Sequence, residues 1–179
     1  MDLTETRLAS TPVFDGNLLH IRSDTVRLPN GKTATREWMH HRGACVIVAF
    51  DAAGRLLLVR QYRYPIGQTI LELPAGKIDE GETPLECAAR ELEEETGCIA
   101  GRLTHFATMT PSPAYTDEML YLFFAEDLTE RGQHLDADEF LTVERMPLDE
   151  ALALLDGDGL IDAKTQIGLL RWLRHRETA

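Results

Sequence analysis

The chain has 179 residues, of which 44% are hydrophobic, and its formal net charge is -12. This length and apolar content suffice for one folded domain whose core needs no disulfide bonds. Because a strongly acidic surface repels phosphates, we expect neither nucleic acid nor a membrane as a partner. A small polyanionic substrate is compatible with this charge only where a bound cation reverses the sign locally.

No segment of the sequence predicts secretion or insertion into a membrane. The longest apolar runs, residues 44–50 and 119–125, have the length of strands and are far too short to span a bilayer. The first twenty residues lack the positive start and the apolar block of a signal peptide. The three cysteines are odd in number and have no CxxC spacing, which is typical of reduced thiols. We therefore expect a cytoplasmic protein.

Short β-rich runs alternate with helical patterns, which indicates the α/β class. Asn30-Gly31 lies between two strand-like runs, and both residues tolerate the positive φ of a tight hairpin. A second hairpin is predicted around residues 51–54, and the apolar run at 119–125 predicts a strand buried on both faces. The predicted strands are residues 18–28, 32–40, 44–50, 55–60, 69–73 and 119–125.

The best-defined helix is predicted over residues 84–96. Thr83 and Glu86 match a capping box, Pro84 occupies the first helical position, and Gly97 supplies a left-handed end. Helices are also predicted at 148–156 and after Asp162, which is a suitable N-cap. By helical spacing, the residues expected to face the core are Leu85, Ala88, Ala89 and Leu92 in the first helix and Ile167, Leu170 and Leu173 in the last.

The first of these helices concentrates acid near its C-terminus. Glu91, Glu94 and Glu95 are spaced i, i+3 and i+4, so their carboxylates share one face. Like charges at that spacing cost about 0.2–0.5 kcal/mol per pair, and the helix dipole disfavours them by a further 0.3–1 kcal/mol each, roughly. A solvated acidic face is the simple interpretation of such a run. The alternative is a set of hard oxygen ligands for a divalent cation such as Mg²⁺.

The surrounding residues favour the alternative. Gly76, Glu82 and the run Arg90-Glu91-Leu92-Glu93-Glu94-Glu95-Thr96-Gly97-Cys98 resemble the Nudix box, G-x5-E-x7-R-E-U-x-E-E-x-G-U, in which U is apolar. Every fixed position matches, and Cys98 replaces the usual aliphatic residue as a small hydrophobe. The resemblance implies a Nudix-type α/β/α sandwich with a mixed β-sheet and a small N-terminal β-sheet extension. It also implies metal-dependent hydrolysis of a diphosphate bridge.

The resemblance assigns roles to single residues. It implies that Mg²⁺, or alternatively Mn²⁺, is bound by Glu91, Glu94, Glu95 and the backbone carbonyl of Ala75. Arg90 is expected to orient a glutamate of this set rather than to contact substrate, because its fork of hydrogen bonds lies one turn before Glu94.

Beyond the box, most of residues 36–175 resemble the ADP-ribose pyrophosphatase subgroup. The matching segments are residues 58–65 leading into 71–76, the loop at 110–118, and Ile161-Asp162 followed by a helix. The subgroup implies hydrolysis of ADP-ribose to AMP and ribose 5-phosphate. It also implies that Arg63 contacts phosphate, that Pro113 shapes the substrate loop and that Arg36 belongs to the base pocket. Ala114 departs from the subgroup's usual glycine, which weakens the assignment of the substrate.

The general base is left open among Glu139, Asp136, Asp138 and Glu94. The subgroup implies a base in the acidic loop before residues 140–144, and Glu139 aligns best with it. However, Ala137 stands where the subgroup often has an acid.

Subgroup members are typically homodimers, so residues 1–42 are expected to form a dimerisation extension and residues 43–179 the catalytic domain. Two alternatives to ADP-ribose hydrolysis remain. One is the same chemistry on another nucleoside diphosphate sugar, a dinucleotide or an oxidised nucleotide. The other is a non-catalytic nucleotide sensor, which the intact box disfavours.

Overall fold

The computed structural model describes residues 1–157 and 159–178, which form two compact units. The first unit comprises Met1–Gly43 and Thr110–Met119, and the second comprises Ala44–Met109 and Leu120–Ala179. No helix of the described residues is long and apolar enough to cross a membrane.

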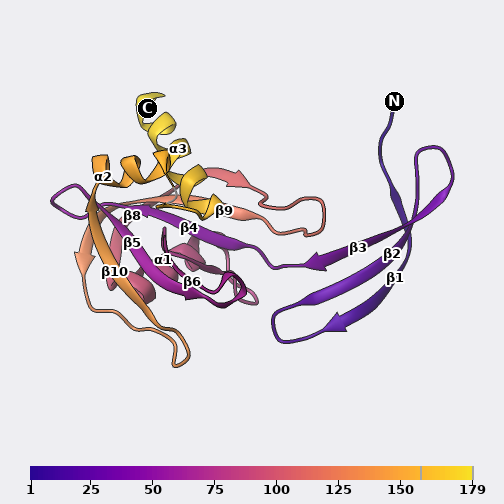
Figure 1. Ribbon diagram of the computed structural model, residues 1–179, viewed down its shortest axis with the longest axis horizontal. Coiled ribbons are helices and arrows are strands. Elements are labelled where there is room, and N and C mark those ends of the chain that lie inside the picture. The colour runs from indigo at the N-terminus through magenta and orange to yellow at the C-terminus, as the bar shows by residue number, and fades with distance from the viewer. Residues whose placement is uncertain (158, 179) are drawn as a thin grey trace. The chain divides into compact units, whose positions relative to one another are not determined.

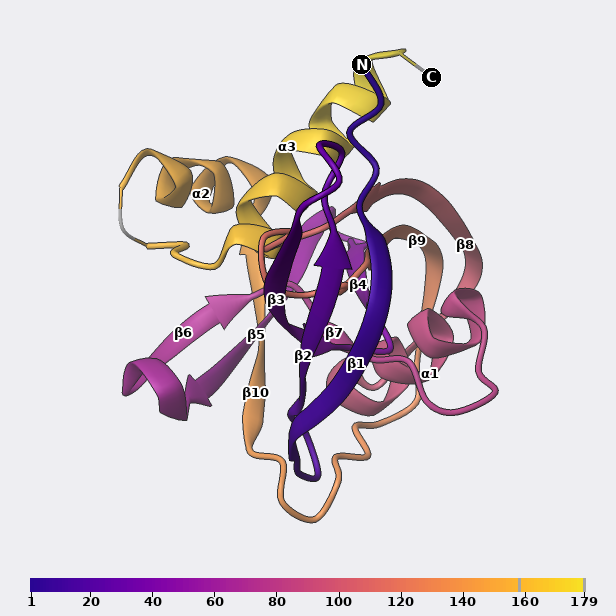
Figure 2. The ribbon, with the colours of Figure 1, turned by 90° about the vertical axis from the view of Figure 1, so that its right-hand side faces the viewer.

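The first unit is built on three antiparallel strands in the order β1-β2-β3, seen side by side in Figure 2. The predicted hairpin is confirmed, with Gly31 at φ 82 in the turn between β2 and β3. The added strand β1 was not expected from the sequence. The loop Thr110–Met119 joins this unit through the bond from Met39 N to the Tyr115 carbonyl oxygen, at 2.8 Å. The strands are β1 (Thr6–Asp15), β2 (His20–Arg27) and β3 (Thr33–His40).

The second unit contains two sheets. One has the order β10-β5-β6, and the other has the order β7-β4-β9-β8. The second sheet is mixed, because β4 and β9 run parallel whereas its other neighbouring pairs are antiparallel. The strands are β4 (Ala44–Ala49), β5 (Arg55–Arg63), β6 (Gln68–Glu72), β7 (Ala75–Lys77), β8 (Cys98–Met109), β9 (Leu120–Glu130) and β10 (Leu141–Pro147). The helical segments are η1 (Tyr64–Ile66), α1 (Pro84–Thr96), α2 (Leu148–Ala153), η2 (Leu154–Asp156) and α3 (Ala163–Thr178).

The second predicted hairpin is wrong. A tight turn does connect β4 to β5, with Asp51 N bonded to the Arg55 carbonyl oxygen at 2.9 Å, but only the single bridge Phe50–Leu56 follows. The two strands then enter different sheets. The apolar run Ala44–Ala49 of β4 and the apolar run at residues 56–59 of β5 are both buried on both faces, and each strand takes a central place between two other strands.

The faces of β4 carry two separate apolar clusters. Val46 packs in one cluster with Leu169 and Trp172 of α3, and Ile47 packs in the other with Leu92 of α1. Because successive residues of a strand point to opposite faces, α1 and α3 cover opposite sides of the sheet, as Figure 1 shows. The expected α/β/α sandwich with a mixed sheet is therefore confirmed.

Helix α1 begins and ends where the sequence predicts, and Ala88 and Leu92 are buried as expected, but the rest of its buried face differs. The capping box of Thr83 and Glu86 is formed, and Gly97 adopts the left-handed conformation at φ 70. Leu85 is 52% exposed and Ala89 is also exposed, so these two residues were wrongly assigned to the core. The residues that α1 buries are Cys87, Ala88, Glu91, Leu92, Glu95 and Thr96.

The predicted inward stripe of α3 is wrong for two of its three residues, because only Leu173 packs against the core. Ile167 is 36% exposed and Leu170 is 54% exposed, whereas Thr165, Leu169 and Trp172 are buried. Asp162 caps the helix as expected, because its carboxylate accepts from Thr165 N at 3.0 Å. The helix instead turns its own Trp172 inward, where the ring packs on Phe50 with ring centroids 4.5 Å apart.

Gly97→Ala is expected to destabilise the second unit by about 2–4 kcal/mol, because left-handed backbone and backbone crowding both oppose a side chain. A Cβ at position 97 would lie 2.7 Å from the backbone of Gly132 and Gln133. The matched control is Gly54→Ala, at φ 74 with nothing within 4 Å, which should cost only about 1 kcal/mol. Urea unfolding measures the free energy of unfolding of both variants. Equal losses of stability would contradict the crowding at position 97.

Candidate active site

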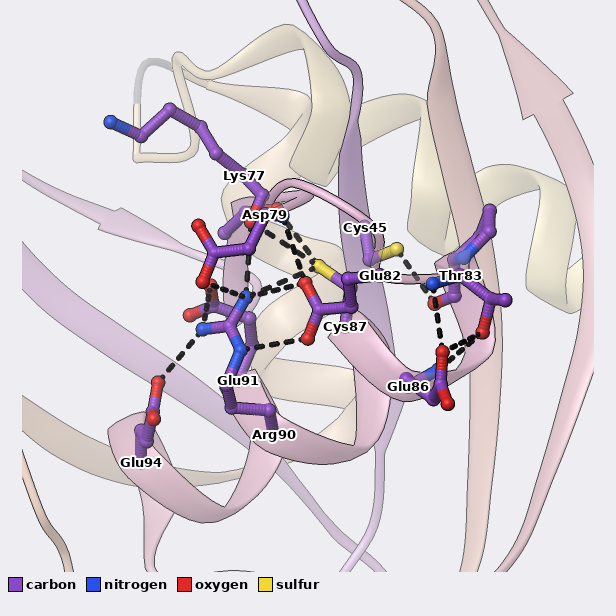
Figure 3. A network of polar contacts seen from close by, with 12 residues as sticks. Cys45, Lys77, Asp79, Glu82, Thr83, Glu86, Cys87, Arg90, Glu91 and Glu94 are labelled. Atoms are coloured by element: carbon purple, nitrogen blue, oxygen red, sulfur yellow. Dashed lines mark hydrogen bonds and ion pairs between the residues drawn. The ribbon is translucent and has the colours of Figure 1, made fainter.

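Arg90 binds three glutamates at once, as Figure 3 shows. Its Nε and Nη2 donate to the two oxygens of Glu82 at 2.9 Å each. Its Nη1 donates to Glu91 at 2.7 Å and to Glu94 at 2.9 Å. Nη2 also reaches the Lys77 carbonyl oxygen at 3.1 Å. The guanidinium thereby joins the loop before α1 to the acidic face of the helix.

Gly76 makes room for one of these carboxylates. A Cβ built at this position would lie 1.8 Å from the carboxyl carbon of Glu91 and within 2.2 Å of both its oxygens. Any side chain here would displace Glu91. The first glycine of the box is therefore required by close approach, because its φ is not positive.

Glu95 is 2% exposed, and the charge of Glu91 acts on it. One of its oxygens accepts from Ala75 N at 2.9 Å. This bond links the last turn of α1 to the segment that enters β7. The residues expected to bind metal, Ala75, Glu91, Glu94 and Glu95, thus come from two adjoining segments.

Burial shifts the protonation of this cluster. Desolvation raises the pKa of Glu91 to about 6, against the opposing hydrogen bond from Arg90. Desolvation raises the pKa of Glu95 to about 8, and the hydrogen bond from Ala75 opposes it only in part. In contrast, the hydrogen bonds from Arg90 lower the pKa of Glu82. Two carboxyls are therefore buried with too little positive charge beside them.

The donor set fits a hard divalent cation. Among residues 1–157 and 159–178, no three histidine, cysteine or acidic side chains are already arranged around a common point. Instead, Arg90 binds one oxygen of Glu91 and one of Glu94. The second oxygen of each has no hydrogen-bond partner within the described part of the chain. Carboxylate oxygens of this kind are the ligands that Mg²⁺ and Mn²⁺ prefer.

A second charged cluster was missed by sequence reasoning. Glu72 is 1% exposed and accepts two bonds from Arg63, at 2.6 and 2.7 Å. Lys164 also contacts Glu72, and it donates to Asp162 at 2.9 Å. The available signal was a glutamate inside the apolar run Ile70-Leu-Glu-Leu73, since a charge in a buried strand needs a partner.

Three candidates for the general base lie in the loop after β9, and they differ in burial. Asp136 and Asp138 are exposed, whereas Glu139 is half-buried. Desolvation and the charge of Asp136 raise the pKa of Glu139, while Arg63 opposes the rise. The interacting groups include Glu94, so Glu139 lies within electrostatic range of the acidic face of α1.

Two residues assigned to the substrate lie in the first unit. Arg36 forms a double hydrogen bond with Glu5, at 2.9 Å through Nε and 2.6 Å through Nη2. Pro113 is exposed in the loop Thr110–Met119. Their roles stay predictions.

The geometry of α1 and its preceding loop agrees with comparisons to known proteins. A model of the Nudix domain matches residues 39–165, which is more than half of the chain. The chain therefore belongs to the Nudix family, whose hydrolases generally require a divalent metal. A model of the nucleoside diphosphate sugar hydrolase N-terminal domain matches residues 5–39.

Particular relatives are similar over nearly the whole length. The ADP-ribose pyrophosphatase of Bacillus subtilis is 41% identical over 165 residues, covering 91% of this chain and 89% of that protein. The methanol dehydrogenase activator of Bacillus methanolicus is 36% identical over 167 residues, covering 92% and 90%. A crystal structure of an ADP compounds hydrolase superposes with a TM-score of 0.86 at 28% identity, covering 100% of both chains.

The metal-free protein is expected to lose stability as the pH rises from 4.5 toward about 8. The folded pKa values of Glu91 and Glu95 lie above the usual 4.5, so the folded state holds more protons than the unfolded chain in this window. Glu95→Gln removes the larger shift. Its Tm in EDTA should exceed that of the wild type at pH 8 and approach it at pH 4. A Tm of the variant below that of the wild type at pH 8 would contradict the raised pKa of Glu95.

Proposed function

We propose that the protein hydrolyses ADP-ribose to AMP and ribose 5-phosphate, with Mg²⁺ as the metal and Mn²⁺ as the alternative. The observation that carries this proposal is the burial of Glu91 and Glu95 with insufficient positive charge, on the helix face that also presents Glu94. A bound cation removes the cost of ionising such carboxyls. The N-terminal match to nucleoside diphosphate sugar hydrolases supports a substrate of that class.

Glu91, Glu94, Glu95 and the Ala75 carbonyl are the residues proposed to hold the metal. When bound, a divalent cation neutralises the diphosphate oxygens and lowers the pKa of a water molecule. Arg90 keeps Glu91 and Glu94 in one orientation, because its Nη1 bonds to both. Glu82 in turn holds Arg90 in place through two parallel hydrogen bonds.

Glu139 is the proposed general base. A raised pKa suits a carboxylate that must take a proton from water near neutral pH. Glu94 is less suited, because Arg90 already binds one of its oxygens. Asp136 and Asp138 are exposed and fit the role less well.

Substrate recognition is assigned to Arg63, Arg36 and Pro113. Arg63 is the proposed phosphate contact, since its side chain is 40% exposed beside the buried Glu72. Arg36 and Pro113 are proposed for the base and ribose side. The relatives named above differ in their described activities, so another nucleoside diphosphate sugar or a dinucleotide is the alternative substrate.

The test is turnover on a panel of ADP-ribose, other nucleoside diphosphate sugars, dinucleotides and nucleoside triphosphates, with Mg²⁺ and with EDTA. We expect AMP to be released fastest from ADP-ribose and only with metal. Preference for another diphosphate would overturn the substrate but keep the chemistry. No metal-dependent turnover on any compound would favour a ligand sensor.

Glu95→Gln should reduce kcat at least about a hundredfold, because a neutral amide is a poor ligand for a hard cation. The matched control is Glu93→Gln on the same helix, whose side chain points away from the acidic face and should leave kcat unchanged. Circular dichroism checks that both variants are folded. Near-normal turnover of Glu95→Gln would remove this residue from the metal site.

We also propose a cytoplasmic homodimer that associates through residues 1–42. Strand β1 supports this, because all ten of its residues are exposed, including Leu8 at 44%, Val13 at 63% and Phe14 at 55%. A strand that is exposed along its whole length and carries several apolar side chains is typical of a surface that a partner covers. Three free cysteines are consistent with a reducing compartment.

Light scattering at micromolar concentration should give the mass of a dimer. Val13→Asp should shift the protein toward monomer, since a buried unpaired carboxylate opposes association. Leu170→Asp on α3, which is exposed to a similar degree, is the control and should stay dimeric. A monomeric wild type would overturn the proposal.

A further inference from the structure

Glu72 is a buried carboxylate whose partner is only half-buried. Its side chain is 1% exposed at the end of β6, and that of Arg63 at the end of β5 is 40% exposed. The residues pair in a parallel fork, with Nε donating to Oε1 at 2.6 Å and Nη2 to Oε2 at 2.7 Å. Lys164 of α3 contacts Oε2 from another side.

Stability alone does not explain this arrangement. Replacing a buried ion pair by packed apolar residues is often neutral or stabilising, so a strand end flanked by Leu71 and Leu73 has no structural need of a charge. Each charged group of this cluster also has at least one partner of opposite charge. Asp162 accepts from Lys164 at 2.9 Å, and its carboxylate also caps Thr165.

The fork leaves one edge of the guanidinium available. An arginine has five N–H groups, and the two that point to Glu72 come from Nε and Nη2. The others, including both on Nη1, have no acceptor within the described part of the chain. Because the fork prevents rotation of the planar group, this edge is held in one direction. It is a preformed donor surface for an anion with two oxygens.

The neighbouring backbone connects this arginine to the acidic face of α1. Leu73 N donates to Thr165 Oγ1 at 2.8 Å, and Ala75 N donates to Glu95 at 2.9 Å. Residues 72–75 therefore bind the start of α3 on one side and the last turn of α1 on the other. The charge of Glu95 also acts on Arg63. The outward edge of Arg63 and the carboxylates of α1 thus belong to one rigid arrangement.

We propose that Glu72 is a positioning residue, which fixes the Arg63 guanidinium so that its outward edge receives a phosphate of the diphosphate substrate. The inference rests on the proposed function, because it requires a substrate with a diphosphate. Lys164 balances the second oxygen of Glu72, so that the fork with Arg63 does not leave a buried negative charge uncompensated. Glu72 itself touches no substrate.

Glu72→Gln should raise KM for ADP-ribose about tenfold or more while changing kcat less than about threefold, as expected when binding common to ground and transition states is lost. An amide presents two N–H groups to the donors of Arg63 and Lys164, so the fork cannot form. The matched control is Glu144→Gln on β10, which removes the partner of Arg60, another arginine of β5, and should leave KM unchanged.

A double-mutant cycle separates positioning from general damage. Arg63→Gln should raise KM at least as much as Glu72→Gln, and combining the two should add almost nothing, because Glu72 acts only through Arg63. Additive effects, or an unchanged KM in Glu72→Gln, would overturn the inference. Arg63→Lys serves if Glu72→Gln does not fold, since it keeps both charges but cannot form the fork. A normal KM for Arg63→Lys would also overturn it.

Binding without turnover gives an independent readout. Calorimetry with the analogue of ADP-ribose that has a methylene bridge between the phosphorus atoms should show the same loss of affinity in Glu72→Gln. A wild type that binds and hydrolyses a different diphosphate would contradict the proposed substrate, and the cycle would then be measured with that compound. A wild type active on ADP-ribose with unchanged affinity in Glu72→Gln would contradict only the role of Glu72.

Discussion

The guanidinium of Arg90 is the constraint on which the site depends. It binds Glu82 from the loop before α1 and both Glu91 and Glu94 from the helix, so one cation holds three acidic residues in a fixed arrangement. The local backbone follows from this. Gly76 is needed because Glu91 lies directly against it, and the capping box at Thr83 fixes the start of the helix relative to the loop.

The fold explains why such acidity is concentrated in one place. The apolar face of α1 packs on β4 through Leu92, which buries Glu91 and Glu95 at the same time. Burial opposes ionisation, and Arg90 compensates only part of the resulting cost. The same unit places two cations, Arg63 and Lys164, around the buried Glu72 nearby. The excess negative charge of Glu91 and Glu95 suits a metal ion, and the oriented positive charge of Arg63 suits an anionic substrate.

Features that depend on neighbouring residues could be predicted from the sequence, and features that depend on distant ones could not. The capping box, Gly97 and the turn at Gly31 are local, and the structure confirms them. The spacing of the box also predicted that Arg90 reaches Glu94. The pairing of β4 with β9 is set by burial on both faces, which a turn at residues 51–54 cannot reveal. For the same reason the sequence did not predict the partners of Glu72, since Arg63 and Lys164 are 9 and 92 residues away.

The most direct test of the account is proton release on metal binding. Because the pKa of Glu95 is raised to about 8, this carboxyl is mostly protonated at pH 7 and must ionise to bind a cation. Titrating weakly buffered, metal-free protein with Mn²⁺ at pH 7 should release about one proton per chain, and Glu95→Gln should abolish most of that release. Binding of Mn²⁺ without release of protons, or equal release in the variant, would contradict a metal site on this face of α1.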